Sequence, residues 1–219
     1  MTTFPGSPPL VKGGIVLVDV QTSNINRIIS LQYNPESISR SFQIKSIEGE
    51  NGQRSEALRL TGPPIETINL DAEIDATDQL EHPDDHENTA REGISPQLAA
   101  LETIIYPAAS KLIGNNQRAN TGSLEIAPME TDLTLFIWSK NRITPVRISD
   151  FSVTEDAFDA NLNPIRAKVS LGMRVLTIDD LGFGHVGGSL YMSYQQNKER
   201  LSQMMSSAQL KDFGIKNIF

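Results

Sequence analysis

Cysteine is missing from this chain of 219 residues. Its absence excludes a disulfide framework, a thiol nucleophile and a cysteine-based metal site, and it fits a reducing compartment. The N-terminal stretch has neither the charged region nor the apolar region that a secretory signal contains. No run approaches the roughly 20 apolar residues that are needed to cross a bilayer. We therefore expect no direct membrane insertion.

Clusters of basic residues are also missing, since the chain carries 19 Lys and Arg against 27 Asp and Glu, for a formal net charge of -8. Binding to nucleic acid depends on clustered Lys and Arg, so nucleic acid is not an expected partner. The hydrophobic content of 38% is adequate for a real core. The composition predicts a folded chain with one large β domain, or a domain plus an appendage.

The clearest pattern is a period-two alternation over residues 165–178. Apolar side chains occupy one face of the predicted strand, and Arg166, Lys168 and Arg174 occupy the other. At about 3.3 Å per residue the strand would span roughly 45 Å, about twice a common strand length. Two interpretations of its cationic face stay open: contact with an acidic partner, or an ordinary solvated sheet face.

Turn signals divide much of the remaining chain into further strands. Residues 1–13 are rich in Pro, Gly and Ser, which predicts a flexible N-terminal arm. In residues 65–75 the alternation is strict from Ile68 onward, so this is the next clearest strand. The expected fold is mainly β, an antiparallel β-barrel or sandwich within residues 14–180. Its other strands are expected at residues 14–21, 27–33, 39–47, 132–139 and 144–153.

Two helical regions accompany these strands. Residues 76–94 are acidic and nearly without large apolar groups, so we expect a surface loop. Residues 95–113 carry apolar residues at helical spacing and predict one inserted helix, which Pro107 kinks or divides. Residues 181–219 are predicted to form a glycine hinge and a C-terminal helical tail, with the helix at residues 189–211.

The predicted tail helix has an apolar stripe of Leu190, Tyr194, Leu201 and Met205. A terminal amphipathic helix usually packs on its own domain. Because glycines precede this helix, docking on a neighbouring chain is the rival interpretation, and it is the one that we predict.

No constellation of residues supports catalysis. His82 and His86 lie among three carboxylates, but a proline between them prevents a regular helix from presenting both imidazoles on one face. The segment Gly182–Gly187 satisfies GxGxxG only in the barest sense, since no βαβ unit surrounds it. Asp71 and Asp75 share a strand face but lie about 13 Å apart, beyond the range of catalytic carboxylate pairs. We therefore predict a non-enzymatic protein without a metal or cofactor.

Four separate segments match a known family in order and spacing. They are Gln32–Ile38 (QYNPESI), Gly62–Ile68 (GPPIETI), Leu135–Trp138 (LFIW) and Asn163–Ala167 (NPIRA). With these motifs, the chain resembles the tube and baseplate proteins of contractile injection systems, which are phage-tail-like machines.

The resemblance implies a tail-tube-like β-barrel whose subunits form a six-fold ring, with sheets joining across subunits around a central channel. Family members of this size are baseplate adaptors beneath the tube, and they often end in a LysM peptidoglycan-binding module. Here a helical tail follows the long strand, so we expect no LysM module. A Ser139 also follows Trp138 where the family commonly has Gly, which changes the expected local turn.

Our leading hypothesis is a structural baseplate protein that joins the inner tube to the spike hub, as part of a six-fold ring assembled in the cytoplasm. Expected partners are the chain itself, the inner-tube protein, the spike or hub protein and, through the C-terminal helix, wedge or sheath-proximal baseplate proteins. The alternatives are an inner-tube subunit proper or, from another class, a monomeric β-barrel that binds a small molecule or metal. The interface candidates are Arg166, Lys168, Arg174, Trp138, Leu190, Tyr194, Leu201 and Met205.

Overall fold

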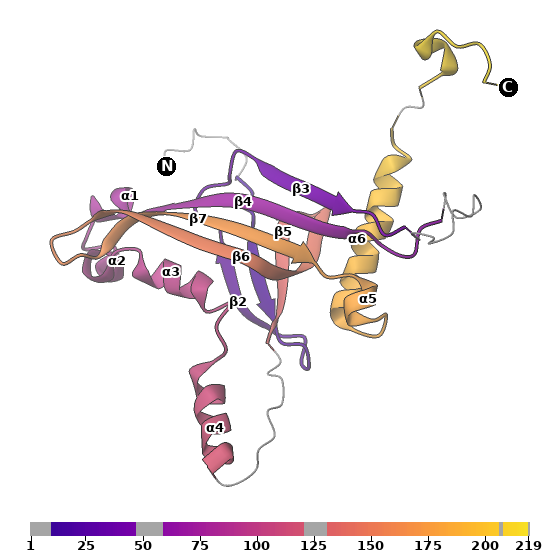
Figure 1. Cartoon of the computed structure of the whole chain (residues 1–219). Helices are drawn as coiled ribbons and strands as arrows, with labels where there is room; N and C mark the ends of the chain where they lie inside the picture. Colours follow the sequence, from indigo (N-terminus) through magenta and orange to yellow (C-terminus); the bar gives the residue numbers. More distant parts are fainter. Residues whose placement is uncertain (1–9, 47–58, 121–130, 206–207, 219) are drawn as a thin grey trace.

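The computed structural model describes residues 10–46, 59–120, 131–205 and 208–218. Within these residues, seven strands form one antiparallel sheet with the order β2-β1-β5-β6-β7-β4-β3 (Figure 1). This confirms the mainly β, antiparallel fold that the alternating patterns predict. The strands are β1 (Gly14–Val18), β2 (Ile25–Ser30), β3 (Ile38–Gln43), β4 (Ile65–Asp75), β5 (Leu133–Ser139), β6 (Arg142–Phe158) and β7 (Pro164–Val175).

The sheet curls around its own core, because strands β1, β2 and β5 run across the direction of β3, β4, β6 and β7 (Figure 1). Strand β6 belongs to both halves: it pairs with β5 up to Val146 and with β7 from Val146 to Phe158. A register shift between Ile148 and Asp150 marks a bulge, a feature that bends a strand and increases its twist.

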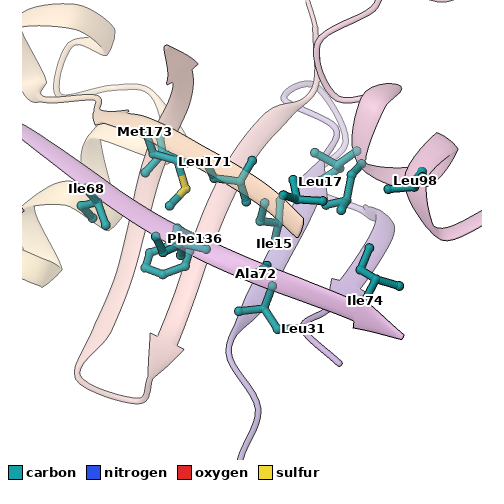
Figure 2. Packing of buried hydrophobic residues seen from close by; sticks show 14 of the residues in the cluster. Ile15, Leu17, Leu31, Ile68, Ala72, Ile74, Leu98, Phe136, Leu171 and Met173 are labelled. Carbon is teal, nitrogen blue, oxygen red and sulfur yellow. The ribbon is translucent and has the colours of Figure 1, made fainter. Parts of the chain in front are cut away.

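The core lies between the two halves of the curled sheet (Figure 2). Ile15 of β1 and Phe136 of β5 face Ile68 and Ala72 of β4 and Leu171 of β7, and all five are buried. Burying a large aliphatic or aromatic side chain contributes roughly 1.5 to 3 kcal/mol, before the cost of ordering it. The strict alternation of β4 and β7 therefore provides one complete wall of this core.

Helices cover the core from two sides. Leu98 and Leu101 of α3 (Ser95–Glu102) are buried in the core, and Leu98 lies on the side of Leu17 and Ile74 (Figure 2). From α6 (Val186–Ser202), the buried side chain of Tyr191 enters the same cluster. The sheet and the first turns of the C-terminal helix thus share one hydrophobic core.

The inserted region is more structured than its acidic composition predicts. The predicted surface loop at residues 76–94 contains two short helices, α1 (Thr77–Leu80) and α2 (Glu87–Glu92). Gly93 follows α2 in the left-handed region, with φ of 60°, and a Cβ at that position would lie 2.2 Å from the carbonyl oxygen of Pro164. Only glycine permits this close approach of the loop to the start of β7.

The predicted helix at residues 95–113 is divided into α3 and α4 (Ala109–Asn120). The break falls around Pro107, because proline removes a helix donor and clashes with the preceding turn. Helix α4 points away from the sheet in Figure 1.

The C-terminal region corrects the predicted glycine hinge. A short helix α5 (Ile178–Leu181) begins with a capping box between Thr177 and Asp180. Gly187 and Gly188 then lie inside α6 and are buried, and a Cβ on Gly188 would stand 2.0 Å from the carbonyl oxygen of Gly182. These glycines allow close packing of α6 against the preceding turn, which is the opposite of a free hinge. A 3-10 helix, η2 (Leu210–Phe213), lies near the end of the chain.

Parts of three predicted segments lie outside the described residues: residues 1–9 of the arm, residue 47 of the strand at 39–47, and residues 206–207 of the tail helix at 189–211. The end of the arm is held by the side chain of Asn34, which accepts from the Gly13 amide at 2.9 Å and donates to the Val11 carbonyl at 2.9 Å. Among the described helices, none is both long enough and apolar enough to span a membrane.

Candidate assembly site

Strands β3, β4, β7 and β6 present a continuous surface that points away from the core, which we call the polar face. The strand register places its side chains in cross-strand rows. They are all small, polar or charged, with four cations and five anions, so the surface is nearly charge-balanced. The polar face consists of Ser39 and Ser41 of β3; Thr67, Asn69, Asp71, Glu73 and Asp75 of β4; Arg166, Lys168, Ser170, Gly172 and Arg174 of β7; and Arg147, Asp150, Ser152, Thr154 and Asp156 of β6.

Neighbouring strands neutralise the charges near the middle of this face. Asp71 accepts from the hydroxyl of Ser170 at 2.6 Å and pairs with the ammonium of Lys168 at 3.0 Å. These two interactions, with the Ser170 bond first, hold the pKa of Asp71 below its ordinary value. Asp71 therefore remains an anion that is already occupied by its own chain.

The other two cations of the long strand are paired in the same way. Arg166 lies 2.9 Å from Asp75, and Arg174 lies 2.6 Å from Asp180 of α5. Burial alone would raise the pKa of Asp75, but bonds from Thr77 and Arg166 outweigh it and lower that pKa. All three predicted cations thus meet carboxylates of their own chain, so the acidic contact that the sequence leaves open is at least partly internal.

Two edges of the polar four-stranded region carry no further strand in the described sheet. One is β3, which is the last strand in the sheet order. The other is the outer part of β6, because the ladder with β5 stops at Val146 while the ladder with β7 continues to Phe158. An unpaired edge exposes a row of amides and carbonyls that can pair with another chain. The region is therefore open to strand addition on both sides.

Apolar side chains accompany the β3 edge. Phe42 of β3 and Ile44 just after it are both exposed, at 47% and 68%. The guanidinium of Arg40 lies 5.0 Å from the centre of the Phe42 ring, a cation–π contact that holds this ring at the edge. Natural edge strands are usually protected by charge or proline, so an apolar edge indicates a contact surface.

A buried ionic cluster fixes helix α6 to the strands next to this edge. Glu66 of β4 is only 3% exposed, and its carboxylate lies 2.7 Å from Arg40 of β3 and 3.0 Å from Lys198 of α6. The hydroxyl of Tyr194 donates to the same carboxylate at 3.1 Å and accepts from Arg40 at 2.9 Å. Strands β3 and β4 and helix α6 are therefore joined through the carboxylate of Glu66.

Tyr194 is part of the helix interface with its own sheet. Burial, and then the negative charge of Glu66, raise the pKa of Tyr194 to about 12. The neutral hydroxyl is the form that bonds to Glu66, so the cluster depends on a protonated Tyr194. This residue, predicted as an interface candidate, is buried inside its own chain.

The remaining interface candidates divide into partly buried and exposed positions. Trp138 packs against the core and stacks on Phe136, with ring centres 6.2 Å apart. Leu190 packs against a small second cluster of Val16, Val18, Leu133 and Leu135. Leu201 and Met205 are exposed, at 39% and 79%. In the predicted stripe, Tyr194 is buried, Leu190 is partly buried, and only these last two positions are exposed.

The histidines do not form a metal centre in the described part of the chain, where no group of three or more His, Asp or Glu side chains is placed to hold a metal. His185 has a structural contact: its Nδ1 accepts from the Gly187 amide at 3.0 Å and so caps the N-terminus of α6. Sequence reasoning missed this cap and the Glu66 cluster. The spacing of Glu66 to Lys198, 132 positions, gives no local signal, while a polar side chain before an apolar run does indicate a cap.

Comparisons with known proteins gave a family match and a distant structural similarity. Residues 16–180 match the family described as contractile injection system tube protein. A chain from a solved structure titled "Virion of native gene transfer agent (GTA) particle" has 12% sequence identity and a TM-score of 0.26, covering 74% of this chain and 90% of that chain. That similarity is too low to carry an argument, and comparison with curated proteins gave no match. Since the family match spans well over half of the residues, the chain belongs to the contractile injection system tube protein family.

Proposed function

We propose that this chain is a non-enzymatic structural subunit that forms a closed ring around the channel of a contractile injection system, with its polar face lining the channel. The observation that carries this proposal is the polar four-stranded region with an unpaired edge on each side. Family membership supports a structural role in a phage-tail-like particle.

Each copy has one unpaired strand edge at β3 and another along the outer part of β6, and two such edges can form backbone hydrogen bonds with each other. If β3 of one copy pairs with the outer part of β6 of the next, the sheet continues from copy to copy. Repetition of the same rotation closes a ring and leaves no unpaired edge, as the six-fold symmetry implied by the family resemblance requires. The polar faces of all copies then lie on the same side of one continuous sheet.

The chemistry of the polar face suits the wall of a channel. It offers no large apolar side chain on which a passing molecule would adhere. Its central charges are paired across strands, so they contribute little net field. A channel lined by this surface in every copy would be hydrated and would bind passing molecules only weakly.

Within the particle, we place the ring at the baseplate, where it would join the inner tube to the spike hub. Support comes from the C-terminal region that begins with α6. It follows the family match at residues 16–180, and α6 lies at the end of the sheet where β4 begins and β7 ends (Figure 1). Such an addition gives the ring two different ends, as a junction between unlike partners needs. We include assembly in the cytoplasm, which the cysteine-free composition supports. An inner-tube subunit proper is the second candidate.

Paired proline substitutions test the edge directly. Backbone amides along a strand point alternately to its two sides, so Thr154→Pro and Glu155→Pro remove donors from opposite sides of β6. One variant loses a bond to β7 and should melt at a lower temperature. The other loses only a donor on the unpaired side, and should keep the melting temperature while losing rings in electron micrographs of reconstituted particles. If both variants form rings, or if only the less stable one fails, β6 is not the joining edge.

A further inference from the structure

The ionic cluster beside the β3 edge is not balanced in charge. Its one carboxylate, Glu66, is paired with two cations, Arg40 of β3 and Lys198 of α6. Among the described residues, neither cation forms an ion pair with any other carboxylate. The hydroxyl of Tyr194 is uncharged at neutral pH, because burial and then the charge of Glu66 raise its pKa to about 12. The cluster therefore carries one surplus positive charge.

This surplus charge reaches the surface at the β3 edge. The side chains of Arg40 and Lys198 are 25% and 34% exposed. Both cations lie over the ring of Phe42, at 5.0 Å for Arg40 and 5.5 Å for Lys198 from the ring centre. We call these three residues the cationic edge site. Exposed cations around a half-exposed aromatic ring suit a carboxylate that arrives from another chain.

The outer part of β6 carries a carboxylate on the core side of the sheet. Two other acids of this segment, Asp150 and Asp156, belong to the polar face. Glu155 instead stands beside Ala167 of β7, whose side chain is buried in the core. Glu155 is exposed, and no ion pair among the described residues includes it. One unbalanced negative charge therefore lies along this edge, on the side away from the polar face.

Strand direction and side-chain orientation limit how the two edges can meet. Strands β3 and β6 run in opposite directions, because each neighbouring pair in the order β3-β4-β7-β6 is antiparallel. Rotation about a ring axis preserves strand direction along that axis, so β3 of one copy meets β6 of the next as an antiparallel pair.

The register of that pair is restricted as well. Arg40 points to the core side, since it stands beside the buried Ile68 of β4. If the polar face continues from copy to copy, Arg40 stands opposite a residue of β6 that also points to the core side. If all of β3 pairs within the unpaired length of β6, that residue is Phe151, Val153 or Glu155.

We propose that Glu155 of one copy binds the cationic edge site of its neighbour, and that this charge pair sets the register of the joined sheet. Of the positions open to Arg40, only Glu155 brings opposite charges together. Opposite Phe151 or Val153, the surplus cation would face an apolar side chain. Lys198 gives helix α6 a direct part in the contact. The inference rests on the proposed ring and deepens it, because backbone hydrogen bonds between two edges do not by themselves distinguish these registers.

Disulfide cross-linking can report the register, because the chain contains no cysteine. Ser41 lies on the polar face and, in the proposed register, stands opposite Thr154 of the next copy. Rings with Ser41→Cys and Thr154→Cys, mildly oxidised, should form a ladder of linked chains. Within one copy, β4 and β7 separate the two cysteines, so the ladder reports contacts between copies. The matched controls replace Thr154→Cys with Ser152→Cys or Asp150→Cys, which would stand opposite Ser41 in the other registers.

The three double-cysteine chains give distinguishable outcomes. The Thr154 chain should cross-link at least about tenfold faster than either control, because side chains one step away on the same face are about 7 to 8 Å apart and too distant for a disulfide. Faster cross-linking through Ser152 or Asp150 overturns the assigned register but leaves the ring intact. Rings without any cross-link from Ser41 contradict the joining edges themselves, and with them the proposed function.

Charge reversal tests the partner of Glu155. Glu155→Lys should slow the expected cross-link at least about tenfold, whereas the matched Asp156→Lys on the polar face should change it less than about twofold. Lys198→Ala removes the surplus cation and leaves Arg40 paired with Glu66, so in that background Glu155→Lys should slow the reaction much less. Melting temperatures of the unassembled chains control for folding. An equal slowing in both backgrounds contradicts the cationic edge site as the partner.

Discussion

The two halves of α6 share one apolar stripe but have different surroundings. Over its first turns, Tyr191 and Tyr194 are buried on the sheet, and Gly188 packs against the preceding turn. Beyond Lys198, Leu201 and then Met205 just past the helix are exposed. The first half of α6 therefore packs on its own domain, while docking of the exposed side chains on another chain stays a prediction.

Two truncations should separate these halves most strongly. Ending the chain after Gly187 removes Tyr191 and Tyr194 and leaves the Glu66 carboxylate without two of its partners, so we expect insoluble or unfolded protein. Ending it after Gln203 keeps the whole of α6, so we expect a melting temperature near that of the full chain. Differential scanning calorimetry and soluble yield provide the comparison. A soluble, cooperatively folded protein from the first truncation would show that the docked half is dispensable.

Glu66 of β4 should be the most sensitive single position for the packing of the first half of α6 on the sheet. Glu66→Ala removes the carboxylate shared by Arg40, Lys198 and the Tyr194 hydroxyl, and losing hydrogen bonds to a charged group costs about 1.5 to 3 kcal/mol of unfolding free energy. The matched control is Glu73→Ala on the polar face, where the exposed side chain should contribute less than about 0.5 kcal/mol. Urea unfolding measures both values. Similar values for the two variants would mean that the cluster does not hold the helix.

The raised pKa of Tyr194 predicts a loss of stability in alkali. Its folded pKa is about 12, and an unfolded tyrosine has a pKa of about 10. Between these values the folded protein keeps a proton that the unfolded chain releases. The stabilisation is therefore complete below about pH 10 and is lost as the pH rises through the folded pKa.

Within this window, each pH unit should lower the unfolding free energy by up to about 1.4 kcal/mol more in the wild type than in Tyr194→Phe. Chemical unfolding at several alkaline pH values gives the two slopes, with Tyr106→Phe as an exposed control. Parallel slopes for the wild type and Tyr194→Phe would exclude a buried, proton-retaining Tyr194.

Substitutions in the exposed residues at the end of α6 and just past it should change the unfolding free energy least. Leu201→Ser with Met205→Ser changes side chains that contribute little to the monomer core, so the unfolding free energy should shift by less than about 1 kcal/mol. A large loss of monomer stability would assign these residues to the core, and would contradict the distinction between a packed first half and an exposed second half of α6.

Periodicity predicts the strands well where one face is buried. The predicted strand at residues 65–75 coincides with β4, because its side chains alternate strictly between core and solvent. In β6, the prediction of residues 144–153 misses the end of the strand at Phe158. Beyond Val153 both faces are exposed, so no alternation is required, and the strand continues through its pairing with β7.

The candidate site is only partly visible in the sequence. The polar face follows from the alternation in β4 and β7, and its cations are visible as a pattern. The carboxylate partners are set by register between strands, as with Asp75 and Arg166, which lie 91 positions apart. Gly187 and Gly188 are part of the predicted hinge but pack closely inside α6, because composition does not distinguish flexibility from close packing. A contact that tertiary structure alone creates leaves no periodic signal.

Electron cryomicroscopy of the purified particle, with this chain located in the density, tests the central claim most directly. We predict a closed ring in which the polar face lines the channel, and β3 of each copy lies beside the outer part of β6 of its neighbour. A ring whose channel is lined by another surface, or copies that contact each other without joining these edges, would contradict it.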